Sequence, residues 1–222
     1  MEYMNKEDSK STVKNEKADR RFFYLLIKRI FDFVASFFGL IVLSPLFLII
    51  AIAIKLESPK GNVFYSQTRL GKNQTPFRMY KFRSMEMNAD QKLKDLLKDN
   101  EIDGAMFKMK NDPRVTKVGH FIRKYSIDEL PQLINVLIGN MSLVGPRPPL
   151  PREVEKYSEN EKRRLLVKPG CTGLWQVSGR NDIDFYGMVR IDLNYIENRS
   201  FYLDVKIIMK TVKIMLIPNA AY

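Results

Sequence analysis

The chain has 222 residues and a formal net charge of +12 at pH 7, with one cysteine and one histidine. That length suffices for one domain with a modest core and a membrane element. A single cysteine, Cys171, excludes an intrachain disulfide. A single histidine, His120, makes a histidine-rich zinc site hard to build, so we interpret it as structural. The positive charge suits anionic partners such as nucleic acid, anionic lipid or phosphate-bearing substrates.

The N-terminal quarter divides into a polar tail and an apolar run. Residues 1–19 predict a disordered tail, and residues 20–58 predict a membrane-embedded helix. The uncharged stretch from Phe33 to Ile54 is about 22 residues, or roughly 33 Å as a straight helix, which just spans a bilayer core. Near its middle, Pro45 has no N–H for the Ile41 carbonyl, so a break is expected, and the Ser44 hydroxyl can satisfy that carbonyl.

Basic residues lie on both sides of this run. They are Arg20, Arg21, Lys28 and Arg29 before it and Lys55, Lys60, Arg69 and Lys72 after it. Because cytoplasmic flanks carry the positive excess, two basic flanks favour a helix that enters and leaves the membrane on one side. An ordinary kinked span is the alternative.

The rest of the chain predicts a small, mostly helical domain. Two apolar-aromatic segments in Val63–Arg83, separated by Gly71-Lys72-Asn73, predict a β-hairpin. Helical patterns follow at 88–99, 121–137 (in two pieces), 153–167 and 184–198, with loops at 103–119 and 168–180. Near the C-terminus, Lys206, Lys210 and Lys213 recur at helical spacing among apolar residues. This pattern indicates a helix at the membrane interface or, alternatively, a surface helix of the domain.

The candidate chemistry lies in SIDELPQLINVLIGNMSLVGPRP, from Ser126 to Pro148. Asp128 and Glu129 are adjacent acids near an expected helix start, where they can bind a metal or attack phosphorus. Ser126 to Glu129 also matches a capping box, so the two acids can alternatively be interpreted as part of a helix start with no catalytic role. Arg147 stands between two prolines, and guanidinium groups bind anionic oxygens bidentately. Three further arginines beside rigid or glycine-rich sequence are candidates for the same role, although any one alone fits a surface residue: Arg83, Arg123 and Arg180.

Taken together, these segments resemble the bacterial sugar transferases, the monotopic phosphoglycosyl transferases that prime lipid-linked glycan assembly. The resemblance runs from about Lys28 to the C-terminus and rests on KRIFDFVAS with Ser44-Pro45, YKFRSM, NDPRVTKVGHFIRKYSIDELPQLINVL, MSLVGPRP and PGCTGLWQVSGR. The length is similar to the short, catalytic-domain-only members.

The resemblance implies a two-step transfer from a UDP-sugar to undecaprenyl phosphate. Asp128 would attack the sugar-linked phosphate and release UMP, and Glu129 would be the second acid; both would lie at the Mg²⁺ cofactor. The residues at phosphate-binding positions would be Arg123, Arg147 and Arg180, with Lys81 and Arg83 in less defined roles. The resemblance suggests glucose or galactose as the sugar, and N-acetylated sugars stay open.

The implied architecture is an α-rich α+β fold. It combines an N-terminal re-entrant membrane helix broken at Ser44-Pro45, a compact catalytic domain over residues 59–222 with a small β-hairpin, and a C-terminal interfacial helix. The expected place is the cytoplasmic face of a bacterial cell membrane, in exopolysaccharide or capsule synthesis. Expected partners are membrane lipid, downstream glycosyltransferases and a second copy in a homodimer, but no nucleic acid.

Two rival classes remain. A membrane scaffold or basic nucleic-acid binder would interleave basic residues with exposed aromatics, whereas the charges here are dispersed. A multi-span polyprenyl-phosphate transferase needs several apolar runs, and the sequence has one strong run.

Overall fold

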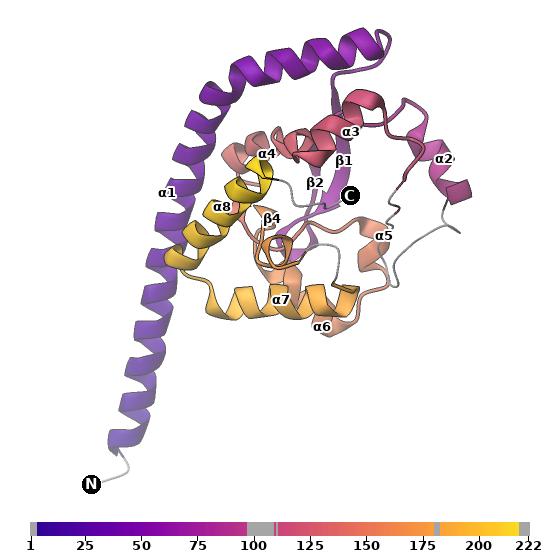
Figure 1. Ribbon diagram of the computed structural model, residues 1–222. Coiled ribbons are helices and arrows are strands. Elements are labelled where there is room, and N and C mark those ends of the chain that lie inside the picture. The colour runs from indigo at the N-terminus through magenta and orange to yellow at the C-terminus, as the bar shows by residue number, and fades with distance from the viewer. Residues whose placement is uncertain (1–3, 97–108, 110, 180–182, 218–222) are drawn as a thin grey trace.

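The computed structural model describes residues 4–96, 109, 111–179 and 183–217 of the chain. One long helix is followed by a β-hairpin and then by short helices and two short parallel strands. In Figure 1 the long helix α1 (Met4–Glu57) runs along one side of the helical domain and then over its top. The fold is therefore α-rich with a small β element, as the sequence predicts.

Helix α1 bends sharply in its second half (Figure 1). Pro45 lies inside α1, and proline is a common cause of such a kink because it lacks a backbone donor and its ring clashes with the preceding turn. The Ser44 hydroxyl donates to the carbonyl of Ile41 at 2.7 Å. That carbonyl is the one left without its helical donor by Pro45, so the expected compensation is confirmed.

The same helix begins at Met4, inside the segment that the sequence predicts to be a disordered tail. The structure therefore assigns helix where the polar composition indicates none. The division into tail, membrane helix and domain stays a prediction.

The first part of α1 is tied to the domain by polar contacts. Asp204, only 2% exposed, accepts hydrogen bonds from the Tyr24 hydroxyl at 2.9 Å and the Lys28 ammonium at 2.8 Å. It also accepts one from the Tyr195 hydroxyl at 2.7 Å. The Arg29 guanidinium donates to two carbonyls at the end of helix α4 (Gln132–Ile138), at 2.6 and 2.8 Å. A cation at that position complements the negative end of the helix dipole.

Beyond the bend, α1 packs on a different part of the domain. Ile50 and Ile54 are buried in one cluster with Phe82 and Ile122. The carboxylate of Glu57 accepts from the first two backbone amides of helix α3 (Lys117–Lys124), at 2.8 and 3.2 Å. The two parts of α1 thus fix the domain from two sides.

The predicted hairpin is confirmed as β1 (Phe64–Leu70) and β2 (Pro76–Phe82), joined by the 3₁₀ turn η1 (Lys72–Gln74). The strands are antiparallel, and the register opposes Tyr65 to Lys81 and Arg69 to Phe77. Because side chains alternate along a strand, Arg69 and Lys81 lie on the same face of the hairpin.

The remaining elements complete the domain around this hairpin. They are α2 (Ala89–Leu96), η3 (Ile127–Glu129), β3 (Ser142–Val144), β4 (Gly170–Thr172), η5 (Trp175–Val177), α7 (Phe185–Asn198) and α8 (Phe201–Leu216). The expectation of an irregular loop at 168–180 missed β4, which pairs in parallel with β3. A Cβ atom on Gly170 would lie 2.0 Å from the Gly145 backbone nitrogen, so glycine permits this close approach.

The prediction of one amphipathic helix over residues 153–167 is wrong. The structure has three pieces there: α5 (Pro151–Val154), α6 (Glu159–Lys162) and η4 (Arg163–Leu166). Ser158 starts α6 with a capping box to Glu161, which ends the preceding segment. The aromatic ring of Tyr157 is buried, and Arg164 donates to its hydroxyl at 3.1 Å.

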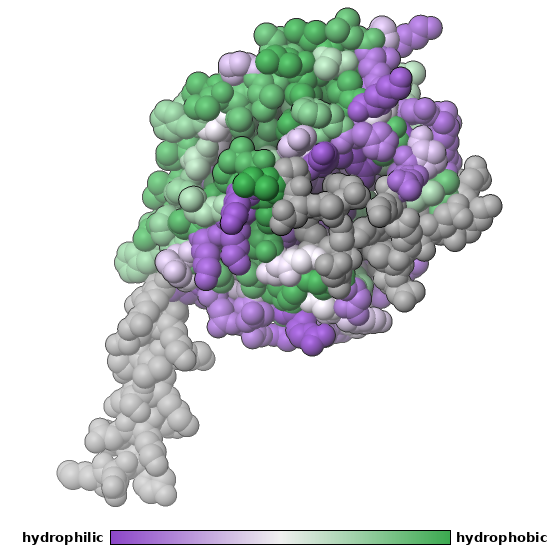
Figure 2. All heavy atoms as spheres, in the orientation of Figure 1, coloured by the Kyte–Doolittle hydropathy of each residue, from purple (hydrophilic) through white to green (hydrophobic). Residues whose placement is uncertain are grey.

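Large apolar side chains stay exposed along α1 and α8, which lie side by side (Figure 1). Within the described residues, Arg21–Glu57 is long and apolar enough to cross a membrane, yet only 11% of its 18-residue apolar window is buried. Figure 2 shows the apolar surface spreading over this side of the molecule. A core helix would be mostly buried, so this surface indicates membrane association.

The cluster at Asp204 gives a stability prediction. Replacing Asp204 with Ala leaves the Lys28 ammonium, 12% exposed, without its carboxylate. We expect a loss of about 3–5 kcal/mol in unfolding free energy, measured by denaturation in detergent. Glu197→Gln removes an exposed ion pair with Arg163 and should cost less than about 1 kcal/mol. Equal effects of the two variants would contradict the anchoring role of Asp204.

Candidate functional site

The two adjacent acids lie on the 3₁₀ turn η3, between α3 and α4. Ser126 precedes them with φ of 55°, in the left-handed region that non-glycine residues rarely occupy. Its side chain makes no capping hydrogen bond, so the capping-box interpretation is wrong. Helix α4 starts only at Gln132, with Pro131 as the residue before it, because proline is best tolerated at a helix start. A left-handed non-glycine residue next to two acids is typical of a functional turn.

The two acids have different surroundings. Asp128 is only 7% exposed, whereas the side chain of Glu129 is 42% exposed. Lys81, from β2, donates to Glu129 at 2.6 Å. The hairpin therefore delivers one of the predicted site residues to the acids, and Lys81 and Glu129 are brought together.

Burial raises the pKa of Asp128 from 3.8 to about 6. Lys81 and Arg123 act in the opposite direction, and the negative charge of Glu129 adds to the effect of burial. Arg123 stands in the last turn of α3, so three of the predicted site residues surround this carboxyl group electrostatically. At neutral pH the group is ionised, and its limited solvation suits a nucleophile.

Arg147 extends from a segment whose backbone is held through its carbonyls. The Pro146 carbonyl accepts from the Gly170 backbone amide at 2.9 Å. The Pro148 carbonyl accepts from the Arg69 guanidinium at 3.0 Å, and the Pro149 carbonyl accepts from the Leu70 backbone amide at 3.0 Å. Because proline has no backbone N–H, this segment is held in place through its carbonyl oxygens. Within the described part of the chain, the half-buried Arg147 side chain makes no hydrogen bond or ion pair. It is therefore available to an anionic ligand.

Of the other predicted site residues, Arg83 makes its contacts elsewhere. Arg83 donates to the Ser58 carbonyl at 3.2 Å, and a Cβ atom on Gly61 would lie 1.3 Å from its guanidinium. Arg83 thus packs against the turn that follows α1, and its phosphate role stays a prediction. Arg180 lies outside the described residues, so its role is likewise a prediction.

Sequence reasoning missed Asn135, which is fully buried in α4. Its side-chain oxygen accepts from the Tyr80 backbone amide at 3.0 Å, and its amide nitrogen donates to the hairpin backbone at 2.7 Å. Asn135 thereby fixes β2, and with it Lys81, against the helix that follows the acids. The available signal was an asparagine with apolar residues on both sides in the stretch QLINVLI.

The residues present fit a magnesium ion that is shared with a phosphate ligand. Within the described ranges, no group of three or more His, Cys, Asp or Glu side chains is placed to hold a metal. Mg²⁺ commonly takes one or two carboxylates and completes its shell with substrate phosphates and water. Asp128 and Glu129 supply that number, so the expected cofactor is compatible with the site.

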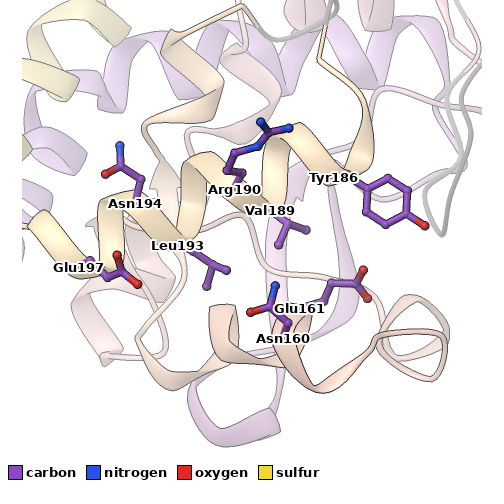
Figure 3. A pocket seen from close by; sticks show the side chains of 8 residues that line it. All are labelled: Asn160, Glu161, Tyr186, Val189, Arg190, Leu193, Asn194 and Glu197. Carbon is purple, nitrogen blue, oxygen red and sulfur yellow. The ribbon is translucent and has the colours of Figure 1, made fainter.

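A surface pocket lies elsewhere, between α6 and α7 (Figure 3). It is lined by Asn160, Glu161, Tyr186, Val189, Arg190, Leu193, Asn194 and Glu197. None of the predicted site residues lines it, so we do not place the chemistry there.

Comparison with known proteins identifies the family. Residues 23–218 match the family described as bacterial sugar transferase, so the chain belongs to that family.

Three relatives are informative. The undecaprenyl-phosphate galactose phosphotransferase of Salmonella typhimurium is 48% identical, covering 88% of this chain and 42% of the relative. The undecaprenyl-phosphate glucose phosphotransferase of Komagataeibacter xylinus is 42% identical, covering 85% and 36%. The exopolysaccharide production protein ExoY of Rhizobium meliloti is 42% identical, covering 89% and 88%. The chain spans less than half of the first two relatives and most of the third.

The raised pKa of Asp128 gives a test that does not involve turnover. The folded state binds this proton more tightly than the unfolded state, so folded stability falls as pH rises from about 4 to about 6. The difference of about two pKa units corresponds to at most about 3 kcal/mol. Asp128→Asn removes this penalty, so the variant should melt several degrees higher than the wild type at pH 7.5 in EDTA, but not at pH 3.5.

Thermal unfolding of both proteins in detergent measures this difference. An Asp128→Asn variant that is less stable than the wild type at pH 7.5 would contradict a buried, poorly solvated carboxylate.

Proposed function

We propose that the protein transfers a sugar 1-phosphate from a UDP-sugar to undecaprenyl phosphate, as a phosphoglycosyl transferase. The observation that carries the proposal is the buried Asp128 carboxylate, on which the positive charges of Lys81 and Arg123 act. The Arg147 guanidinium makes no hydrogen bond or ion pair among the described residues and adds a cation that a phosphate can bind. The names of the relatives and the exposed apolar surface of α1 support it.

The first step is nucleophilic attack by Asp128. A carboxylate oxygen forms a bond to the phosphorus that bears the sugar, and the P–O bond to UMP breaks, with the electron pair leaving on UMP. An oxygen of undecaprenyl phosphate then attacks the same phosphorus and regenerates the Asp128 carboxylate. Splitting the transfer into two steps at one phosphorus is covalent catalysis.

Charge is the main obstacle, because a carboxylate must approach a diphosphate. Lys81 neutralises Glu129, and Arg123 and Arg147 supply positive charge near the reacting phosphates. When bound by Asp128 and Glu129, Mg²⁺ supplies further charge neutralisation.

The donor sugar is proposed as glucose or galactose. Relatives of this chain are named for each of these two sugars. The corresponding pathway is exopolysaccharide or capsule synthesis, and ExoY is named for exopolysaccharide production.

The membrane geometry follows from the bend in α1. If the helix enters and returns on the cytoplasmic side, the acids lie close to the inner-leaflet headgroups, where undecaprenyl phosphate presents its phosphate. The exposed apolar side chains and exposed lysines of α8 suit a helix lying at that interface.

A direct activity test is UMP release from a panel of UDP-sugars in the presence of undecaprenyl phosphate. We expect turnover with UDP-glucose or UDP-galactose, no turnover by Asp128→Asn, and a severe loss in Glu129→Gln. Excess EDTA should abolish activity, and added Mg²⁺ should restore it. Absence of turnover with every donor would favour the non-enzymatic scaffold, and full activity in EDTA would reject the metal.

Topology can be tested separately by cysteine labelling. Single cysteines replace Lys6 or Lys156 in a Cys171→Ser background, and an impermeant thiol reagent is added to intact cells. We expect neither position to label in the parent. Replacing Ser44 with Leu and Pro45 with Ala should straighten the helix and expose position 6 to the reagent. Labelling of position 6 in the parent would reject the re-entrant helix.

A further inference from the structure

Arg69 is a buried arginine on the face of the hairpin that carries Lys81. Its side chain donates to the Gln67 side-chain oxygen at 2.7 Å and to the Pro148 carbonyl at 3.0 Å. The Nε atom is buried and, among the residues that the structure describes, has no hydrogen-bond partner. Arg69 is 6% exposed, so water does not complete its hydrogen bonding from an open surface.

Within the described part of the chain, no carboxylate lies at ion-pair distance from Arg69, and Glu153 and Glu129 act on it only from farther away. Among the described residues, two of the other buried arginines are paired with carboxylates: Arg114 with Asp112 at 2.6 Å and Arg164 with Asp192 at 2.7 Å. The third, Arg83, is 9% exposed and donates to the Ser58 carbonyl instead. No such ion pair exists for Arg69 in the described part of the chain. Burying an unpaired cation costs free energy, so an unpaired buried guanidinium needs a reason.

The charged groups that act on Arg69 favour an anionic ligand. Burial, followed by the positive charge of Arg147, lowers the pKa of Arg69 to about 10, so the group stays charged at neutral pH. Glu153 and Glu129 act in the opposite direction. Two neighbouring guanidinium groups repel each other until an anion lies between or beside them.

Arg69 also holds the segment that carries Arg147. It bonds the carbonyl of Pro148, the residue after Arg147, and the next residue of β1, Leu70, bonds the carbonyl of Pro149 through its backbone amide. The end of β1 therefore fixes the chain direction just beyond Arg147. A displacement of Arg69 would move Arg147.

We propose that Arg69 completes the phosphate site: it positions Arg147 through the Pro148 carbonyl and supplies a buried positive charge that a diphosphate neutralises. The inference rests on the proposed function, because the ligand class is the diphosphate of a nucleotide-sugar. Its role is positioning and electrostatic, and Asp128 stays the reacting group.

Two substitutions separate the positive charge of Arg69 from its hydrogen bond to the segment that carries Arg147. Arg69→Met removes both the charge and the hydrogen bonds, whereas Arg69→Lys keeps the charge and loses the planar fork. Arg78→Met is the matched control, because Arg78 lies on the same hairpin but on the opposite face, exposed and bonded to Ser66. Binding of UDP with Mg²⁺ is measured by titration calorimetry over a range of salt concentrations, together with kcat and KM for UMP release.

We expect Arg69→Met to weaken UDP binding by about tenfold or more and to reduce its salt dependence. Arg69→Lys should keep the salt dependence and weaken UDP binding less than Arg69→Met does, yet lose about tenfold in kcat, because Arg147 is no longer held. Arg78→Met should match the wild type in both measurements.

UDP affinity within twofold of the wild type in folded Arg69→Met would overturn the proposal. If Arg69→Met does not fold, Arg69→Lys decides: a kcat equal to that of the wild type overturns the positioning role. A wild-type protein that does not bind UDP also overturns the proposal. A wild-type protein that binds UDP but transfers no sugar phosphate rejects the proposed function alone, because the UDP titration needs no turnover.

Discussion

The carboxylate of Asp128 is buried among positive charges, and much of the domain serves to keep it there. Burial disfavours the ionised form, while Lys81 and Arg123 favour it, and the net result is a pKa of about 6. The group is thus ionised at neutral pH with little solvent around it. That balance depends on the left-handed backbone of Ser126, which turns the chain from α3 into η3, and on Asn135, which fixes the hairpin that carries Lys81. A small shift of the hairpin would alter both the ion pair of Lys81 with Glu129 and the environment of Asp128.

The two parts of α1, before and after its bend, contact the domain in two different regions. The part before the bend is tied to Asp204 and to the end of α4, and the part after it packs on β2 and α3. The elements that carry Asp128 and Glu129 are therefore held between the two contact regions of α1. The proposed reaction, with an acceptor phosphate at the lipid headgroups, requires such a fixed relation between the site and α1. The Ser44 hydroxyl lowers the free-energy cost of the bend by satisfying the Ile41 carbonyl.

Sequence patterns predicted the turns, kinks and helices whose conformation depends on residues close together in the chain. The turn at Gly71-Lys72-Asn73 predicted the hairpin, Pro45 predicted the kink, and the helical pattern at 184–198 predicted α7. The adjacent acids and Arg147 could be selected from the sequence for the same reason, because their neighbours are rigid.

Contacts between distant segments could not be predicted from local sequence patterns. The parallel pairing of β3 and β4, the break of residues 153–167 at Ser158, the Asn135 link to β2 and the burial of Arg69 all depend on tertiary packing. Arg83 shows the reverse case: its sequence surroundings and the resemblance suggested a site residue, yet it packs against Ser58 and Gly61.

The central claim is that Asp128 forms a covalent bond to the phosphosugar. Intact-mass spectrometry of the protein incubated with its UDP-sugar and Mg²⁺, without undecaprenyl phosphate, tests it most directly. The account predicts that the wild type gains the mass of one sugar phosphate, that peptide mapping places it on Asp128, and that undecaprenyl phosphate then removes it. An adduct on another residue, or an active protein that never acquires an adduct under single-turnover conditions, would contradict it.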